Sequence, residues 1–279
     1  MTIPRPIHRL CRRFGRAGLA GLAVLAVLAA TPARADFEAG WRAYQAGDFA
    51  TARREWQPLA EQGHGLAQYN LGVLYAEGKG VAEDRATALR WWRRAAEQGV
   101  AAAQHNLAND YIAEVGTPDA YEKAVALLRK AAAAGLARSQ YTLGKMYSYG
   151  LGVDKDDAEA FRLFLKAGRA GNPKAQYNLG KSYRDGRGVE RNLVEAARWF
   201  LKAAEQGYAK AQSHIGIRYA RGEGIRRDEV EALKWITLAA EQGQPAAIEN
   251  RKALIGRMTR EQIAEAARLA EEWKRRRQR

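Results

Sequence analysis

Apolar residues follow a helical spacing in two consecutive stretches of the chain. In 67–78 (AQYNLGVLYAEG), Ala67, Leu71 and Tyr75 are four residues apart and form one stripe of a helix. The next stretch begins at Asp84 (DRATALRWWRRAAEQG), and its stripe consists of Ala88, Leu89, Trp92, Ala95 and Ala96. Glycine follows each stripe, and Asp84 stands where an N-cap is expected. The pattern predicts two short helices joined by a loop.

The same pattern returns every 36 residues. AQYNLG occurs at 67–72 and again at 175–180, which is three periods later. Five such units run without insertion from 67 to 246, and their equivalent glutamines are Gln68, Gln104, Gln140, Gln176 and Gln212. A period of about 20–50 residues is typical of stacked repeats that bury their apolar faces against each other.

Two recurring features of the first helix indicate close packing. Glycine inside a helix costs about 1 kcal/mol relative to alanine, yet it recurs at Gly72, Gly144, Gly180 and Gly216. We therefore expect the paired helix to approach too closely for a side chain. Hydrogen bonds between helices are expected from the recurring glutamines and from Asn70, Asn106 and Asn178.

These residues carry a family resemblance. The segment AQYNLGVLYAEGKGVAEDRATALRWWRRAAEQG is similar to the Sel1-like repeat, a relative of the tetratricopeptide repeat, and 175–210 match that pattern throughout. The resemblance implies an all-α, right-handed superhelical solenoid of helix-turn-helix repeats. The second repeat departs from the pattern, because its loop at 114–118 lacks the first glycine. A different loop geometry is expected there.

The segments that flank the repeats predict caps. In 36–66, Asp48, Ala52 and Trp56 stand 36 positions before their counterparts but follow a shorter loop, so this segment resembles a tetratricopeptide-like N-terminal cap hairpin. In 247–279, Thr259-x-x-Gln262 has the form of a capping box that opens a helix to about Arg275. We expect C-terminal capping helices with a basic tail.

Residues 1–35 have the features of a secretory signal peptide. Arginines precede an apolar stretch at 17–30, and Ala33-Arg34-Ala35 forms a small-x-small cleavage site. The apolar stretch is too short for a membrane span, which needs about 20 residues. We expect a periplasmic protein that begins at Asp36 and has no transmembrane segment, with release from the cell as the weaker alternative. The export route stays open.

Export changes the composition that matters for function. Removal of the six arginines in 1–35 lowers the formal net charge from +15 to +9, and it also removes the single cysteine, Cys11. The exported chain is then without disulfides, thiolate metal sites or thiol nucleophiles. The sequence contains neither HExxH nor GxSxG, and its GxG pairs lack a preceding strand, so they are expected to be loop glycines. We expect no enzyme activity, no cofactor, no metal and no nucleic-acid partner.

Binding is expected where the repeats differ. Positions 69, 73 and 76 lie opposite Leu71 on the first helix and vary among the repeats. In the family that the chain resembles, the first helices line a concave face, and there the predicted partner-binding residues are Tyr141, Lys145, Tyr177, Lys181 and Arg184. This aromatic row with a basic centre suits an acidic peptide or domain. An ordinary solvated face is the alternative.

The sequence therefore favours a non-catalytic protein-binding scaffold, adaptor or regulator in the bacterial cell envelope. One alternative is a β-lactam-binding or hydrolysing enzyme, because a cysteine-rich branch of the Sel1-like family has been linked to that chemistry; this chain lacks the paired cysteines of that branch. Another alternative is a binder of anionic envelope polymers through the positive surface. The identity of the partner and the oligomeric state stay open.

Overall fold

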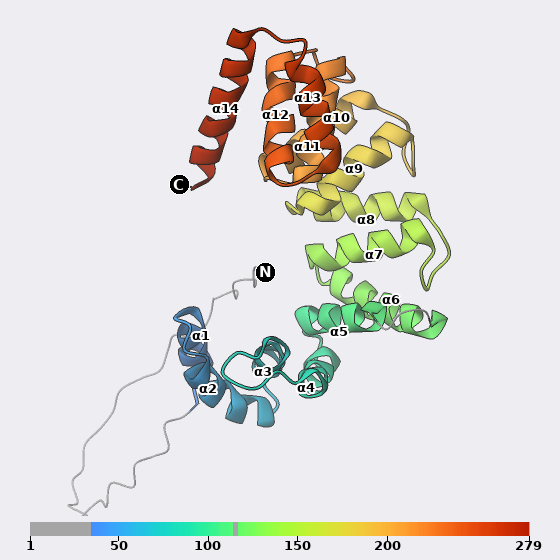
Figure 1. Ribbon diagram of the computed structural model, residues 1–279. Coiled ribbons are helices and arrows are strands. Elements are labelled where there is room, and N and C mark those ends of the chain that lie inside the picture. The colour runs from blue at the N-terminus through green and yellow to red at the C-terminus, as the bar shows by residue number, and fades with distance from the viewer. Residues whose placement is uncertain (1–34, 114–116, 279) are drawn as a thin grey trace, which may run out of the picture. The chain divides into compact units, whose positions relative to one another are not determined.

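The computed structural model describes residues 35–113 and 117–278. These residues form fourteen α-helices and no strand (Figure 1). In chain order they are α1 (Phe37–Gln45), α2 (Phe49–Glu61), α3 (Gly65–Glu77), α4 (Arg85–Glu97), α5 (Ala101–Ala113), α6 (Pro118–Ala133), α7 (Ala137–Tyr149), α8 (Asp157–Arg169), α9 (Pro173–Asp185), α10 (Leu193–Glu205), α11 (Ala209–Arg221), α12 (Glu229–Glu241), α13 (Pro245–Ile255) and α14 (Arg260–Gln278). Except for Ala35, the predicted signal peptide lies outside the described residues, as do 114–116 of the second repeat's loop.

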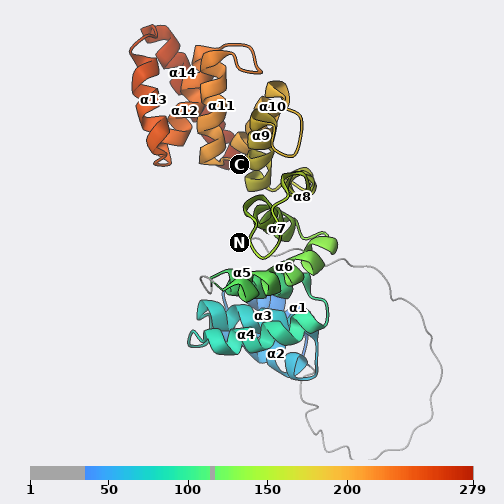
Figure 2. The same cartoon turned by 90° about the vertical axis from the view of Figure 1, so that its right-hand side faces the viewer.

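Consecutive hairpins lie side by side (Figures 1 and 2). We call α3, α5, α7, α9 and α11 the first helices, and α4, α6, α8, α10 and α12 the second helices of the repeats. Each first helix packs against the second helix of its own repeat and against that of the repeat before. The predicted all-α solenoid of helix-turn-helix repeats is confirmed.

Local sequence signals set the ends of these helices. The Asp84 carboxylate accepts a hydrogen bond from the backbone N–H of Thr87 at 3.0 Å, which confirms the predicted N-cap of α4. Left-handed glycines end four of the first helices, at Gly78, Gly150, Gly186 and Gly222. The capping box is also confirmed, because Thr259 N donates to Gln262 Oε1 at 3.0 Å and Gln262 N donates to Thr259 Oγ1 at 3.3 Å. The helix that it opens, α14, ends at Gln278 rather than near Arg275.

The glycines inside the first helices meet large side chains of the paired second helices. A Cβ at Gly180 would lie 2.7 Å from the Phe200 ring, and one at Gly144 would lie 2.7 Å from the Phe164 ring. Such separations are closer than any real Cβ contact. The expected close approach is confirmed: an aromatic ring occupies the space beside Gly72, Gly144 and Gly180, and Ile236 occupies it beside Gly216.

The recurring glutamines connect the repeats. Each donates from Nε2 to a backbone carbonyl near the end of the preceding second helix, at 3.0–3.3 Å; the acceptors are Ala60, Ala96, Ala132, Gly168 and Ala204. The prediction of inter-helix hydrogen bonds is correct for these glutamines. Asn178 donates to the Lys174 carbonyl within α9 at 3.1 Å, and its side chain also hydrogen-bonds the Tyr141 phenol on α7, the preceding first helix.

The GxG pairs are loop glycines, as predicted. The second glycine of each described pair lies against the backbone at the start of a preceding helix: Gly80 against Phe49, Gly152 against Tyr121, Gly188 against Asp157, and Gly224 against Leu193. All four have φ between 65° and 73°, a range that glycine adopts without strain. A side chain there would separate two neighbouring repeats.

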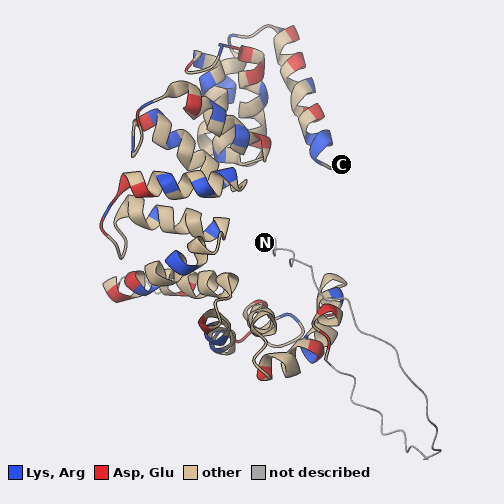
Figure 3. Cartoon of the chain, turned by 180° about the vertical axis from the view of Figure 1, so that it is seen from behind, with Lys and Arg blue, Asp and Glu red and all other residues tan. Residues whose placement is uncertain are grey.

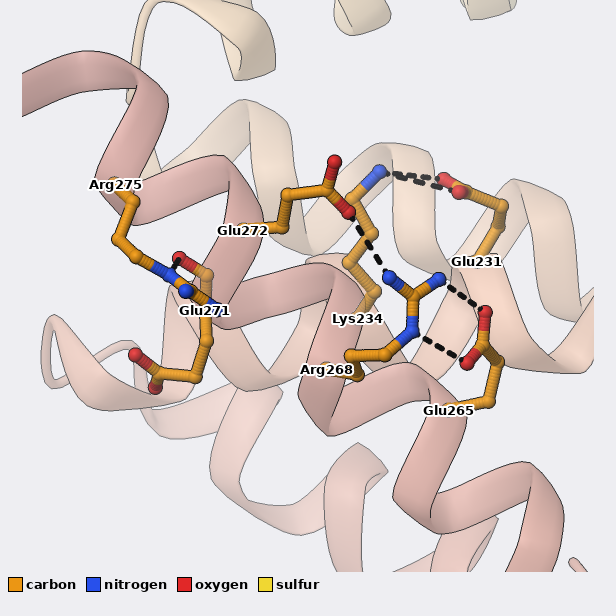
Figure 4. A network of polar contacts seen from close by, with 7 residues as sticks. All are labelled: Glu231, Lys234, Glu265, Arg268, Glu271, Glu272 and Arg275. Carbon is orange, nitrogen blue, oxygen red and sulfur yellow. Dashed lines mark hydrogen bonds and ion pairs between the residues drawn. The ribbon is translucent and has the colours of Figure 1, made fainter. Parts of the chain in front are cut away.

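The last helix covers the final repeat. Helix α14 packs on α12, with Trp273 against Trp235 at 5.8 Å between ring centroids and with Ala266 and Ala270 buried. Ion pairs stiffen its outer side, where the Arg268 guanidinium lies between Glu265 and Glu272 (Figure 4). Among the described helices, none combines the length and the apolar character needed to cross a membrane.

Candidate functional site

The variable positions of the first helices do not all face solvent. Tyr69, His105 and Ser213 are only 5–6% exposed, and Val73 is 8% exposed, so the expectation of one continuous open face is wrong at these residues. They pack toward the neighbouring repeat: Nδ1 of His105 lies 2.9 Å from Oγ of Ser139 in the next first helix. At His105 this position therefore makes a contact between neighbouring repeats, although the sequence pattern assigned it to solvent.

The open part of this surface begins at α7. Lys145 is exposed, and its ammonium lies 5.9 Å from the centroid of the exposed Tyr149 ring. Tyr149 in turn lines a pocket between α7, α8 and α9 that also includes Asn178 and Lys181. Tyr141 is half-buried against Phe164, with ring centroids 6.1 Å apart, and burial raises the pKa of its phenol.

Tyr177 is the aromatic centre of the same surface on α9. Its ring contacts Phe200 and Tyr208, with ring centroids 5.6 Å and 5.4 Å apart, and the Lys181 ammonium lies 5.9 Å from its centroid. Its hydroxyl lies 3.2 Å from Nε2 of His214 on α11. Tyr177 is thus half-buried between repeats, so only part of its ring is open to a partner.

Arg184 continues the positive charge at the end of α9. Its Nε and Nη2 donate to the two carboxylate oxygens of Asp185 at 2.5 Å and 2.7 Å. This bidentate pair raises the pKa of Arg184 and lowers that of Asp185. The pair is nearly neutral overall, so Lys145 and Lys181 supply most of the net charge at the predicted site.

Together these side chains form what we call the basic stripe: Lys145, Tyr149, Tyr177, Lys181 and Arg184. Four of the five predicted residues belong to the stripe. The fifth, Tyr141, is half-buried against Phe164. Basic residues are frequent on the helices of the last repeats and at the C-terminal end of α14 (Figure 3). The stripe spans two consecutive repeats, and α11 lies next to it.

Sequence reasoning missed two residues on α11 that adjoin the stripe. Arg218 is 3% exposed, and His214 contacts both Tyr177 and Phe200. Burial, together with the charge of Arg218, lowers the pKa of His214 to about 4, so the imidazole is neutral at pH 7. The sequence held one signal for Arg218: two equivalent positions in other repeats carry the apolar residues Leu74 and Met146. Both of these side chains are buried in the structure.

One hydrogen-bonded group has the residue types of a nucleophile and its base. His105 lies between Ser139 Oγ and Asn109 Nδ2, at 2.9 Å and 3.0 Å from its two ring nitrogens. Ser139 is fully buried, at 0% exposed, and burial lowers the pKa of His105 to about 4. No substrate reaches such a serine, so the group is a buried polar contact between repeats. Within 35–113 and 117–278, no cluster of three His, Cys, Asp or Glu side chains offers a metal site.

Known proteins share this architecture. The solved structure of a Sel1 repeat protein from Oxalobacter formigenes has a TM-score of 0.71 at 28% sequence identity, over 81% of this chain and 94% of that one. Immunity protein PA5088 from Pseudomonas aeruginosa shares the fold, with a TM-score of 0.52 at 22% identity, over 75% of this chain and 83% of that one. Comparison with curated proteins gives no match.

The Sel1 repeat model matches five consecutive segments, at 65–100, 101–136, 137–172, 173–208 and 209–244. Sel1 repeats generally serve as protein-interaction scaffolds, and the fold is typically non-catalytic. The matched segments cover more than half of the chain and coincide with the hairpins described above, so the chain belongs to the Sel1 repeat family.

Proposed function

We propose that this chain is a non-catalytic scaffold that holds an acidic segment of a protein partner on the basic stripe. The observation that carries the proposal is the run of ammonium groups and tyrosine rings across α7 and α9, within a family of protein-interaction repeats. A peptide with carboxylates and apolar side chains satisfies both kinds of group.

The charges of the stripe favour an acidic partner over a neutral one. Lys145 has no carboxylate partner among the described residues, and neither does Lys181. Each exposed charge contributes roughly 0–1 kcal/mol, so binding rests on several of them together. Such charges raise the association rate most at low ionic strength.

We further propose that the scaffold works in the bacterial periplasm. The support is the signal-like sequence of 1–35, with its cleavage site before Asp36. Intact mass of the protein recovered from the envelope of its host tests this. An N-terminus at Asp36 is expected, whereas an uncut chain would contradict export.

Binding is tested by affinity capture from envelope extract, followed by reconstitution with the purified candidate partner. The triple variant Lys145→Glu, Lys181→Glu, Arg184→Gln is expected to weaken capture at least tenfold at low salt. Arg184 is changed to glutamine because a glutamate there would face Asp185. Helical circular dichroism should stay unchanged.

A matched control makes the same three kinds of change at exposed basic residues of second helices, Lys130→Glu, Lys202→Glu and Arg94→Gln. It is expected to leave capture near the wild-type level. Equal loss of binding in both triples would show that only net charge matters. That result would refute the basic stripe and favour an anionic polymer as the ligand.

A further inference from the structure

Arg218 is a buried cation without a counter-ion. The residue is 3% exposed, and among the described residues no carboxylate lies within ion-pair distance of it. Its Nη1 donates to the His214 carbonyl at 3.2 Å, while its Nε is buried without any hydrogen-bond partner. Nη2 also has no partner among those residues, and it is not sealed from solvent. Most of the donors on this guanidinium are therefore unused.

The carboxylates nearest to Arg218 are engaged elsewhere. Asp185 forms the bidentate pair with Arg184, and Glu223 pairs with Arg221 at 3.4 Å. Burial is the main cause that lowers the pKa of Arg218; the charges of Arg184 and Arg221 also lower it, while those of Glu223 and Asp185 raise it. Buried charges are normally paired, so this arrangement costs free energy in the unliganded protein.

The Phe200 ring accounts for only part of this environment. Cζ of Arg218 lies 4.7 Å from the ring centroid, a cation–π distance. The five N–H donors of a guanidinium lie in its own plane and form a fork that matches a carboxylate. Contact with a ring face leaves these in-plane donors unsatisfied.

Other basic side chains and aromatic rings surround Arg218, an environment that suits one negative charge. Tyr177 on α9 and His214 on α11 both contact the Phe200 ring that Arg218 contacts. The charges of Arg184 and Lys181 are close enough to lower the pKa of His214. Among the described residues, the acids whose charges act here, Asp185 and Glu223, are already paired with Arg184 and Arg221. Rings of Phe200 and Tyr177 supply the apolar walls.

We propose that Arg218, with His214 and Tyr177 beside it, is a socket for a single side-chain carboxylate of a protein partner. The inference rests on the proposed function, because the socket adjoins the basic stripe and extends it onto α11. A glutamate or aspartate from the acidic segment would supply the missing counter-ion. The one buried guanidinium balances one negative charge, which favours a carboxylate over a dianionic phosphate.

The equivalent residue in the third repeat supplies the decisive variant. Met146 occupies the position of Arg218 and is 2% exposed, so Arg218→Met places a residue that the repeat already accepts. If Arg218 serves binding, this variant should unfold at the same or a higher denaturant concentration than the wild type. A clear loss of stability would overturn the proposal, because Arg218 would then be a structural residue.

Ligand binding is measured by NMR on the ring signals of His214 and Tyr177 in the purified chain, at fixed ionic strength. The probe is N-acetyl-glutamate N-methylamide, and its glutamine counterpart is the uncharged control. Saturable shifts are expected with the glutamate compound only. The affinity should fall at least tenfold in Arg218→Met and stay unchanged in Arg221→Met, which removes an exposed charge from the same helix.

Three results would overturn the proposal: no saturable shift, equal binding by Arg218→Met, or tighter binding of inorganic phosphate or of N-acetylglycine, which offers a terminal carboxylate.

The same measurements distinguish failure of the socket from failure of the basic stripe. If the stripe variants lose the partner but Arg218→Met does not bind the glutamate probe differently from wild type, the socket falls and the scaffold stands. If the probe binds at Arg218 while the stripe variants keep the partner, the basic stripe falls.

Discussion

At the scale of single residues, a glycine facing a large ring decides how closely two helices approach. Gly180 and Phe200 show this, because any Cβ at 180 would overlap a ring that is itself fully buried. The second repeat uses another solution, with Ala108 and Leu128 in the same two positions, and both are fully buried. The three aromatic residues at the second position, Trp92, Phe164 and Phe200, all face glycine.

Gly180→Ala is expected to lower the free energy of unfolding by about 1–3 kcal/mol through overpacking, although alanine is the better helix former. Adding Phe200→Leu recreates the pair of the second repeat. The double variant should therefore be more stable than the sum of the two single changes implies. Urea denaturation of all four proteins measures this coupling, and simple additivity would contradict the paired fit.

Two buried histidines make stability depend on pH. Burial lowers the pKa of both His105 and His214 to about 4, while an unfolded chain has a histidine pKa of about 6.5. Between these values the unfolded chain binds more protons, so stability is constant above about pH 6.5 and falls as the pH falls toward 4. The slope is at most about 1.4 kcal/mol per pH unit for each histidine.

His214→Gln should reduce that slope between pH 6.5 and 4.5, and the double variant with His105→Gln should remove most of it. The slope is the readout, because loss of the contact with Tyr177 also changes absolute stability. Unfolding midpoints at half-unit pH intervals give the comparison. An unchanged slope in the double variant would show that neither histidine is held neutral.

At the scale of helices, glutamines join three helices in three of the five repeats. Gln68, Gln176 and Gln212 donate to the preceding second helix and also accept from a glutamine at the end of their own second helix, at 2.7–2.8 Å; those donors are Gln98, Gln206 and Gln242. The second and third repeats lack this donor, because Ala134 and Ala170 stand there, and in the third repeat Oε1 of Gln140 is buried without a partner. This boundary has an incomplete link.

Ala170→Gln should complete the link and raise the free energy of unfolding by about 1 kcal/mol, the usual net value of a hydrogen bond to a group left unsatisfied. Ala170 is exposed at the end of α8, so the new side chain has room. Ala170→Glu is the control, since a carboxylate has no N–H to donate. Equal denaturation midpoints for the two variants would contradict the proposed bond.

The helices were predictable because their signals are local. Asp84, the glycine after each first helix and the Thr259–Gln262 box act within a few residues of themselves, and the period repeats them. The surface was less predictable. Whether Tyr69 or Tyr177 faces water depends on the next repeat, and the burial of Arg218 depends on Phe200 and His214, which lie on separate turns or helices. The periodicity of a single helix does not show which side chains the neighbouring repeat will cover.

At the scale of the whole molecule, the described helices contact mainly their neighbours in the chain. The exceptions lie at the C-terminal end, where α14 packs on α12 and α13 touches α11. In such an array, stability is approximately a sum of repeat terms and interfaces between adjacent repeats. A whole repeat is therefore a removable unit, whereas a single helix is not.

Deletion of 136–171 tests this, because it joins Gly135 to Asn172 and so recreates the junction between Gly171 and the Asn172 N-cap of α9. We expect a folded chain with one cooperative transition, a lower melting temperature and less helical circular dichroism. Gln176 should then bond to the Ala132 carbonyl, which is the acceptor that Gln140 uses now.

Removal of α7 alone, by deleting 136–153, leaves two second helices adjacent and should prevent cooperative folding. The longer deletion keeps Arg218 and its neighbours on α9, α10 and α11, so it should retain the glutamate probe while losing Lys145. If both deletions unfold alike, the repeats are not the independent units that the contacts between neighbours indicate.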